Sequence, residues 1–161
     1  MTATATMQVG VVLERRIALS PWAEHLWLPV AVLPGAPALA PGAALGRTAS
    51  GERFFAGVFA LDLHRTDTAT YRDNLASGIP RIWVAARLVP DAAIPAIVGV
   101  TADPAEGESY TEAGDDIVEH VPMAAEIAAL LAAFVAEHHV ERAFAKRRRR
   151  RWAGADADDG A

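Results

Sequence analysis

The sequence predicts a single α+β domain over residues 7–152, made of a mainly antiparallel sheet of about five strands, two short helices and a long C-terminal helix packed across one face. Three observations carry this prediction. Residues 7–100 contain short stretches in which apolar and polar side chains alternate, the pattern of half-buried strands. From residue 122 the apolar side chains recur every three or four positions, as on a helix. The chain has 161 residues, of which 52% are hydrophobic and 22% charged, which suits one folded domain.

Five stretches are predicted as strands, at residues 7–13, 26–32, 55–63, 82–88 and 96–100. In the first strand, Val9 and Val11 lie on the apolar face and Glu14 lies on the opposite face. Pro29 predicts that the second strand lies at an edge, because proline has no amide hydrogen to donate. A short connection favours an antiparallel pair for the last two strands, whereas the longer connection before residue 82 also allows a parallel crossover.

Two short helices are predicted from their capping signals. Asp67 is placed to cap the first helix, and Gly78 is placed to end it. The second helix begins at Asp103, which is followed by a proline and then by Glu106, the spacing of a capping box. Gly114 is its expected stop.

The last predicted element is a helix that starts near Pro122 and runs to Trp152. Its apolar side chains form one stripe, made of Met123, Ile127, Leu130, Leu131, Phe134, Val135 and His138. Such a helix is ~45 Å long, and a compact chain of this size is ~40 Å across. The basic end of the helix should therefore project, and residues 153–161 should form a disordered acidic tail.

Residues 34–51 match none of these patterns and are predicted as a long mobile loop. Structureless segments longer than ~15 residues are uncommon in compact domains unless they are mobile or functional. The alternative is a lid over a binding site. Such a lid would offer Arg47, Thr48 and Ser50 as its polar groups.

The charge of the chain is unevenly distributed. Residues 1–141 contain eight basic and 17 acidic side chains, a net charge of −9, whereas residues 142–161 contain seven basic and three acidic ones, a net charge of +4. Six consecutive cations account for most of the latter: Lys146, Arg147, Arg148, Arg149, Arg150 and Arg151. We expect them to bind a partner, either an acidic protein or a cofactor phosphate. The alternatives are a solvated helix end that offsets the helix dipole, and nucleic acid, which the acidic body and the lack of interleaved aromatic residues disfavour.

Missing motifs exclude or disfavour several classes of function. The chain has no cysteine, which excludes disulfides, thiolate nucleophiles and cysteine-ligated metals. Its five histidines and the acidic residues at 103–119 lack the spacing of a zinc or calcium site, so no metal is expected. Neither a serine nucleophile elbow nor a phosphate-binding glycine loop occurs, so we assign no catalytic residue. With no basic leader and no uncharged apolar run longer than ten residues, we expect a cytoplasmic protein without a membrane span.

The order of several longer motifs resembles a bacterial family, domain of unknown function family thirty-three-oh-five. The motifs are VGVVLERR (Val9–Arg16), the tryptophans of PWAEHLW (Pro21–Trp27), LHRTDTATYRDNL (Leu63–Leu75), PRIWVAAR (Pro80–Arg87), VTADPAEGESY (Val100–Tyr110), VEHVPM (Val118–Met123) and FVAEHHVERAFAKRRRRR (Phe134–Arg151). Together they extend over nearly all of residues 7–152. The family has no established catalytic residues to carry over.

Genes of this family commonly lie beside those of formate dehydrogenases. The resemblance therefore implies a non-enzymatic accessory protein for maturation or assembly of a molybdenum or tungsten formate dehydrogenase, with a subunit of that enzyme or a maturation factor as its partner. The alternative is a role in biosynthesis or delivery of molybdopterin-guanine dinucleotide, as some members are labelled, in which Arg15, Arg16 and residues 147–151 hold phosphates. No resident cofactor is predicted, and the resemblance implies at most a transiently bound molybdopterin-type cofactor. A guanylyltransferase would begin with a strand and a glycine-rich loop, whereas the first strand here continues into residues 13–17, LERRI.

Overall fold

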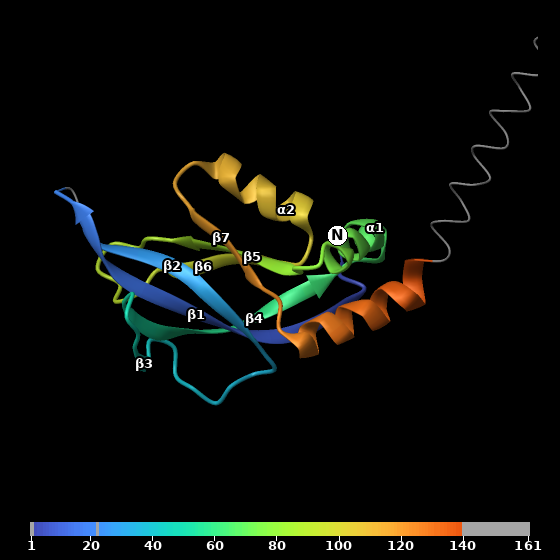
Figure 1. Ribbon diagram of the computed structural model, residues 1–161, viewed down its shortest axis with the longest axis horizontal. Coiled ribbons are helices and arrows are strands. Elements are labelled where there is room, and N and C mark those ends of the chain that lie inside the picture. The colour runs from blue at the N-terminus through green and yellow to red at the C-terminus, as the bar shows by residue number, and fades with distance from the viewer. Residues whose placement is uncertain (1, 22, 140–161) are drawn as a thin grey trace, which may run out of the picture.

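The computed structural model describes residues 2–21 and 23–139, and in them the chain forms seven antiparallel strands and two short helices, followed by a C-terminal helix at residues 125–139 (Figure 1). The strands are β1 (Ala5–Ser20), β2 (Ala23–Pro34), β3 (Ala44–Arg47), β4 (Glu52–Leu63), β5 (Arg81–Arg87), β6 (Ala96–Thr101) and β7 (Ile117–Pro122). The short helices are α1 (Thr68–Ala76) and α2 (Pro104–Ser109), and 3-10 turns η1 (Arg65–Asp67) and η2 (Tyr110–Ala113) lie beside them. The predicted α+β class is confirmed.

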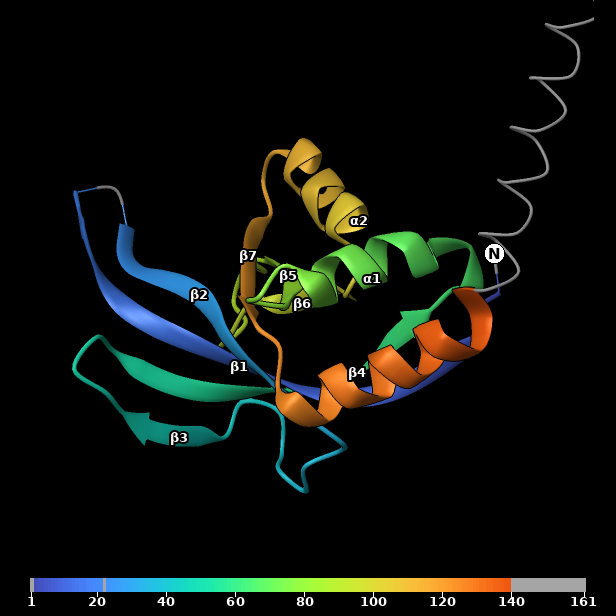
Figure 2. The same ribbon diagram turned by 45° about the vertical axis from the view of Figure 1, so that its right-hand side comes forward.

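The strands form two sheets that share one core. The larger sheet has the order β2-β1-β4-β3, and the smaller one has the order β6-β5-β7. Strand β2 contacts β7 and β4 contacts β6, so the two sheets pack against each other (Figure 2). The buried side chains between them include Val9, Leu13 and Leu61 from the larger sheet, and Ile82 and Val84 from the smaller.

All five predicted strands are present, as β1, β2, β4, β5 and β6. Strand β2 lies at an edge of its sheet, as Pro29 predicts. Strands β5 and β6 pair antiparallel, as their short connection predicts. Strands β4 and β5 belong to different sheets, so the connection between them is not a crossover between parallel strands of one sheet.

The sequence did not predict two strands. The prediction that residues 34–51 contain no element is wrong for β3, whose four residues are all exposed and therefore show no apolar face. Backbone bonds to the next strand hold this region in place, for example from the Phe55 amide to the Ala43 carbonyl at 2.9 Å. Strand β7 ends at Pro122, where the helix was expected to start. Proline is tolerated there because β7 is an edge strand.

Of the two predicted helix caps, one is present in the structure and the other is not. Asp103 accepts a hydrogen bond from the Ala105 amide at 2.9 Å, so the predicted cap of α2 is confirmed. Glu106 does not complete the capping box, since its carboxylate accepts from the Tyr110 hydroxyl at 2.9 Å. The predicted Asp67 cap is wrong: its side chain makes no capping bond, because η1 directly precedes α1 and leaves the Asp67 backbone out of the extended conformation.

The C-terminal helix packs one face into the core. Four residues of the predicted stripe are buried: Ile127, Leu131, Phe134 and Val135. Leu130 is 56% exposed, so its place in the stripe is wrong; at 100° per residue it lies ~80° from the centre of the buried face. The predicted continuation to Trp152, the projecting basic end and the tail at 153–161 lie outside the described residues. No helix among the residues that the structure describes is long and apolar enough to cross a membrane.

Candidate functional site

A pocket lies at the end of the larger sheet, where β1 and β2 continue beyond their neighbour. Strand β1 pairs with β4 only as far as Arg15, but it pairs with β2 as far as Ser20. The turn between β3 and β4 lies against the base of this two-stranded arm (Figure 1). Together they enclose a hollow of about 480 Å³, which we call the arginine pocket. Its lining includes Arg15, Arg16, His25, Arg47, Thr48 and Ser50.

Gly51 allows the turn to approach β1 closely. A Cβ atom at this position would lie 2.4 Å from the Arg15 carbonyl oxygen, well inside contact distance. The Gly51 carbonyl also accepts a hydrogen bond from the Thr48 amide at 2.7 Å, which closes the turn. The absence of a side chain at residue 51 therefore places the polar groups of the turn beside β1.

Glu14 is a buried carboxylate at the base of this end of the sheet. Its side chain is 1% exposed, although its alternation with valines in β1 predicted a place on the polar face. Its Oε1 atom accepts hydrogen bonds from the Thr48 and Ser50 hydroxyls, the former at 2.9 Å. The turn therefore covers the second face of β1, so that neighbouring residues on both faces are buried.

Two guanidinium groups face the other oxygen of Glu14. Arg16 Nη2 lies 3.3 Å from Oε2, and Arg53 Nη2 lies 4.0 Å from it. The hydrogen bond from Ser50 has the largest effect on the pKa of Glu14 and, with those from Thr48 and Arg16, lowers it, against the opposing effect of burial. Glu14 is therefore ionised at neutral pH and orients its donors.

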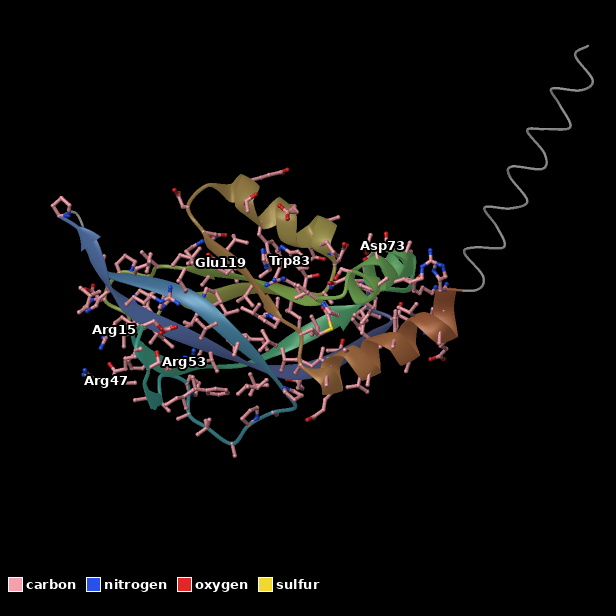
Figure 3. The ribbon with its side chains drawn as sticks, in the orientation of Figure 1. Arg15, Arg47, Arg53, Asp73, Trp83 and Glu119 are labelled. Atoms are coloured by element: carbon pink, nitrogen blue, oxygen red, sulfur yellow. The ribbon has the colours of Figure 1, made fainter. Side chains whose placement is uncertain are left out.

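Arg15 and Arg47 differ in how closely they contact other residues. Arg15 forms an ion pair with Glu52 at 2.7 Å, and its guanidinium lies over the rings of Trp27 and Phe54, 5.8 and 5.1 Å from their centres. Arg47 is 83% exposed, and its Nε lies 4.0 Å from Glu52. Figure 3 shows Arg15, Arg47 and Arg53 at the same end of the molecule.

The site has a surplus of positive charge and of hydrogen-bond donors. Three arginines line the pocket, at 15, 16 and 47, and Arg53 lies beside Glu14; together they face two glutamates, at 14 and 52, which leaves two uncompensated positive charges. The Nε atoms of Arg16 and Arg53 are buried, and neither has a hydrogen-bond partner among the described residues. Buried donors without a partner are rare in folded proteins. The arrangement is thus suited to an anion with several oxygen atoms, such as a phosphate.

Sequence reasoning found part of this site. The sequence suggested Arg15 and Arg16 as phosphate ligands, and it suggested Arg47, Thr48 and Ser50 as the polar groups of a possible lid. All five residues line the arginine pocket in the structure. It missed Glu14 and Arg53, which are paired across β1 and β4. Only the register of those strands would have revealed the pair. The predicted partner-binding residues Lys146–Arg151 lie outside the described residues.

Within residues 2–21 and 23–139, no group of three or more histidine or acidic side chains is arranged to hold a metal ion. The arginine pocket combines donors that Glu14 orients with the exposed guanidinium group of Arg47.

Comparison with known proteins gives one match. A protein-family model described as "Protein of unknown function (DUF3305)" matches residues 8–149, which include all of both sheets except the first three residues of β1, and every described helix. No curated protein and no solved structure matches the chain.

Proposed function

This chain belongs to the DUF3305 family, and we propose that it is a non-enzymatic accessory protein for maturation or assembly of a molybdenum or tungsten formate dehydrogenase. We further propose that it acts by binding a phosphate-bearing ligand in the arginine pocket. The first part follows from the family resemblance of the sequence motifs. The second part follows from the geometry of the pocket.

The surplus of two positive charges in the arginine pocket is the observation that carries the proposed binding. Guanidinium groups bind phosphate oxygens through pairs of charge-assisted hydrogen bonds. Arg47 is 83% exposed, whereas Arg16 is held by Glu14. One exposed cation and one held cation in the lining of a 480 Å³ hollow suit a ligand that carries a phosphate or pyrophosphate group.

The hydrogen bonding and the ionisation of the polar groups in the arginine pocket suit binding better than catalysis. The hydroxyls of Thr48 and Ser50 both donate to Glu14, so each proton already has an acceptor. A general base works best with a pKa near the working pH, but the pKa of Glu14 is lowered. Glu14 is thus a weak base, and its role in the proposal is to orient donors.

The pocket also favours a second candidate, a role in biosynthesis or delivery of a molybdopterin-guanine dinucleotide cofactor. Such a cofactor contains a pyrophosphate, which the same arginines would hold. The two candidates share the ligand site and differ in what the protein contacts next. A carrier must pass its cargo to a formate dehydrogenase subunit or maturation factor, whereas a biosynthetic protein need not bind either.

Titration calorimetry of the full chain tests the ligand class. Pyrophosphate, GTP and the pyranopterin cofactor are each titrated into wild type, Arg47→Gln and a control, Arg65→Gln, whose side chain is exposed in η1 away from the pocket. We expect Arg47→Gln to weaken binding about tenfold, since one charge-assisted hydrogen bond is worth ~1.5 kcal/mol or more. The control should bind as wild type does. Equal affinity of both variants would contradict the proposed site.

Deletion of the gene tests the cellular role. We expect lower formate dehydrogenase activity and a lower metal content of the purified enzyme, both restored by wild type but not by Arg47→Gln. Unchanged activity and metal content would contradict the accessory role. Co-purification then separates assembly or delivery from biosynthesis, because only an assembly or delivery protein should retain a dehydrogenase subunit or a maturation factor.

A further inference from the structure

A second pocket lies between the two short helices and the smaller sheet. It has a volume of about 360 Å³ and is lined by residues that include Asp73 and Ser77 of α1, Trp83 of β5, Glu108 of α2 and His120 of β7. We call it the tryptophan pocket. Figure 3 labels Asp73 and Trp83, two of its lining residues, away from the end of the molecule where Arg15 and Arg47 are labelled.

The aromatic wall of this pocket is held in place by its neighbours. A Cβ atom on Gly107 would lie 2.1 Å from Cγ of Trp83, so α2 rests directly on the indole. The ring of His120 lies 5.6 Å from the indole centre and is tilted by 54°. On the other side, the buried Asn74 side chain donates to the carbonyls of Arg81 and Ala102 at 2.8 and 3.0 Å, which fixes α1 against the sheet.

The chemistry of the tryptophan pocket favours a cation. Asp73 and Glu108 are exposed, and their carboxylates form no hydrogen bond or ion pair with another described residue. Arg81 also lines the pocket, so the two carboxylates leave one net negative charge. An indole face attracts a guanidinium group, and carboxylates accept its hydrogen bonds. An arginine side chain meets both requirements.

We propose that the tryptophan pocket binds an arginine side chain from the segment Lys146–Arg151 of the same chain. The six cations of this segment are opposite in sign to the surface around the pocket: from residue 88 to residue 141 there are eleven acidic side chains and no lysine or arginine. This charge complementarity makes the segment the matching occupant within the chain.

The chain is long enough for this contact. Nδ1 of His139, the last described residue, lies 3.1 Å from the hydroxyl oxygen of Thr68, at the start of α1. From Thr68 to Ser77 the helix rises ~14 Å. The seven residues from 140 to 146 span up to ~25 Å when extended, so Lys146 and the arginines after it can reach the pocket. An acidic partner would then compete with this face for the same cations.

Zero-length carbodiimide coupling of the full chain locates the segment. Lys146 is the one lysine of the sequence, so besides the amino terminus it is the one amine that can be joined to a carboxylate. We expect mass spectrometry to find Lys146 joined to Glu108 or Asp73. In an equal mixture of unlabelled and ¹⁵N-labelled protein, the joined peptides should carry a single label. Mixed labels would show that a second copy supplies the segment and would overturn the proposal.

A variant with Arg147 to Arg151 all replaced by glutamine supplies the second test, because it leaves the described fold and Lys146 unchanged. We expect the yield of the Lys146 linkage to fall about tenfold and the NMR signal of the Trp83 indole N–H to move. The indole of Trp27, at the other end of the molecule, is the internal control and should not move. Raising the salt concentration of wild type should shift the Trp83 signal in the same direction, because it screens the charges. An unmoved Trp83 signal, or linkages equally frequent to carboxylates far from the pocket such as Glu52, would overturn the proposal.

Discussion

Replacing Glu14 by glutamine tests whether the buried carboxylate organises the arginine pocket. Its Oε1 accepts two hydroxyl hydrogen bonds, from Thr48 and Ser50, and its Oε2 faces Arg16 at 3.3 Å. Hydrogen bonds to a charged group are worth ~1.5–3 kcal/mol each, and bonds to a neutral group ~1 kcal/mol. Neutralising the acceptor of two such bonds therefore costs ~2 kcal/mol. The contact with the partly exposed Arg16 adds at most ~1 kcal/mol, because solvent screens it.

We therefore expect Glu14→Gln to lower the free energy of unfolding by ~2–3 kcal/mol. In urea, with a slope of ~2 kcal/mol/M, the midpoint should fall by ~1–1.5 M. The matched control is Glu52→Gln, whose carboxylate pairs with Arg15 and is partly exposed, so that it should cost at most ~1 kcal/mol. If Glu14→Gln unfolds within ~0.5 kcal/mol of wild type, the carboxylate does not organise the site.

The same variant has a defined pH dependence. Because the pKa of Glu14 is lowered in the folded chain, the stability that it contributes is present above the unfolded value of 4.5 and is lost as the pH falls through the folded value. The difference in unfolding free energy between wild type and Glu14→Gln should thus be constant from pH 8 to about pH 5 and shrink below that. A difference that grows on acidification would contradict the lowered pKa.

Three further predictions concern the turn, a buried phenol and the core. Gly51→Val should displace the β3–β4 turn from the β1 carbonyl and reduce binding of pyrophosphate at least tenfold by calorimetry, whereas Ala44→Val, exposed in β3 and outside the pocket lining, should not. Burial raises the pKa of Tyr71 to about 12, so its ring NMR signals should not titrate below about pH 11, and the stability that the protonated phenol provides should be lost as the pH rises from 10 towards 12; titration near pH 10 in the folded protein would refute this. Leu131→Ala should cost ~2–5 kcal/mol of unfolding free energy and Leu130→Ala less than ~1 kcal/mol in urea denaturation, so equal costs would contradict the observed helix face.

The parts of the fold that the sequence predicted are those in which burial follows a simple period. Leu61 and Leu63 are buried and Asp62 between them is exposed, because this end of β4 has one face on the core. Strand β3 has no buried side chain and depends on backbone pairing with β4, so no pattern of side chains marks it. In the sequence, Pro122 is compatible both with the end of an edge strand and with the start of a helix. Its pairing with Arg81 of β5 shows that it ends the strand.

The candidate site was harder to predict because it depends on tertiary pairing. Arg15 and Arg16 are recognisable in sequence as adjacent cations, but adjacent residues of a strand point to opposite faces. Only the structure shows that Arg53 lies opposite Glu14, and that a turn 34 residues further along the chain covers that carboxylate. Glu14 is buried although the alternation of side chains along β1 places it on the polar face, and this exception occurs at the candidate site. Such exceptions are expected where a sequence serves binding as well as folding.

The most direct test of the arginine pocket is to follow the arginine Nε–H signals of the full chain by NMR during titration with pyrophosphate. The Nε atoms of Arg16 and Arg53 are buried without a hydrogen-bond partner among the described residues. We predict that their signals move and saturate together, while the signal of Arg87, which is paired with Asp116 on the smaller sheet, stays in place. If the signals of Arg16 and Arg53 do not respond, or if Arg87 responds equally, the pocket is not the anion site.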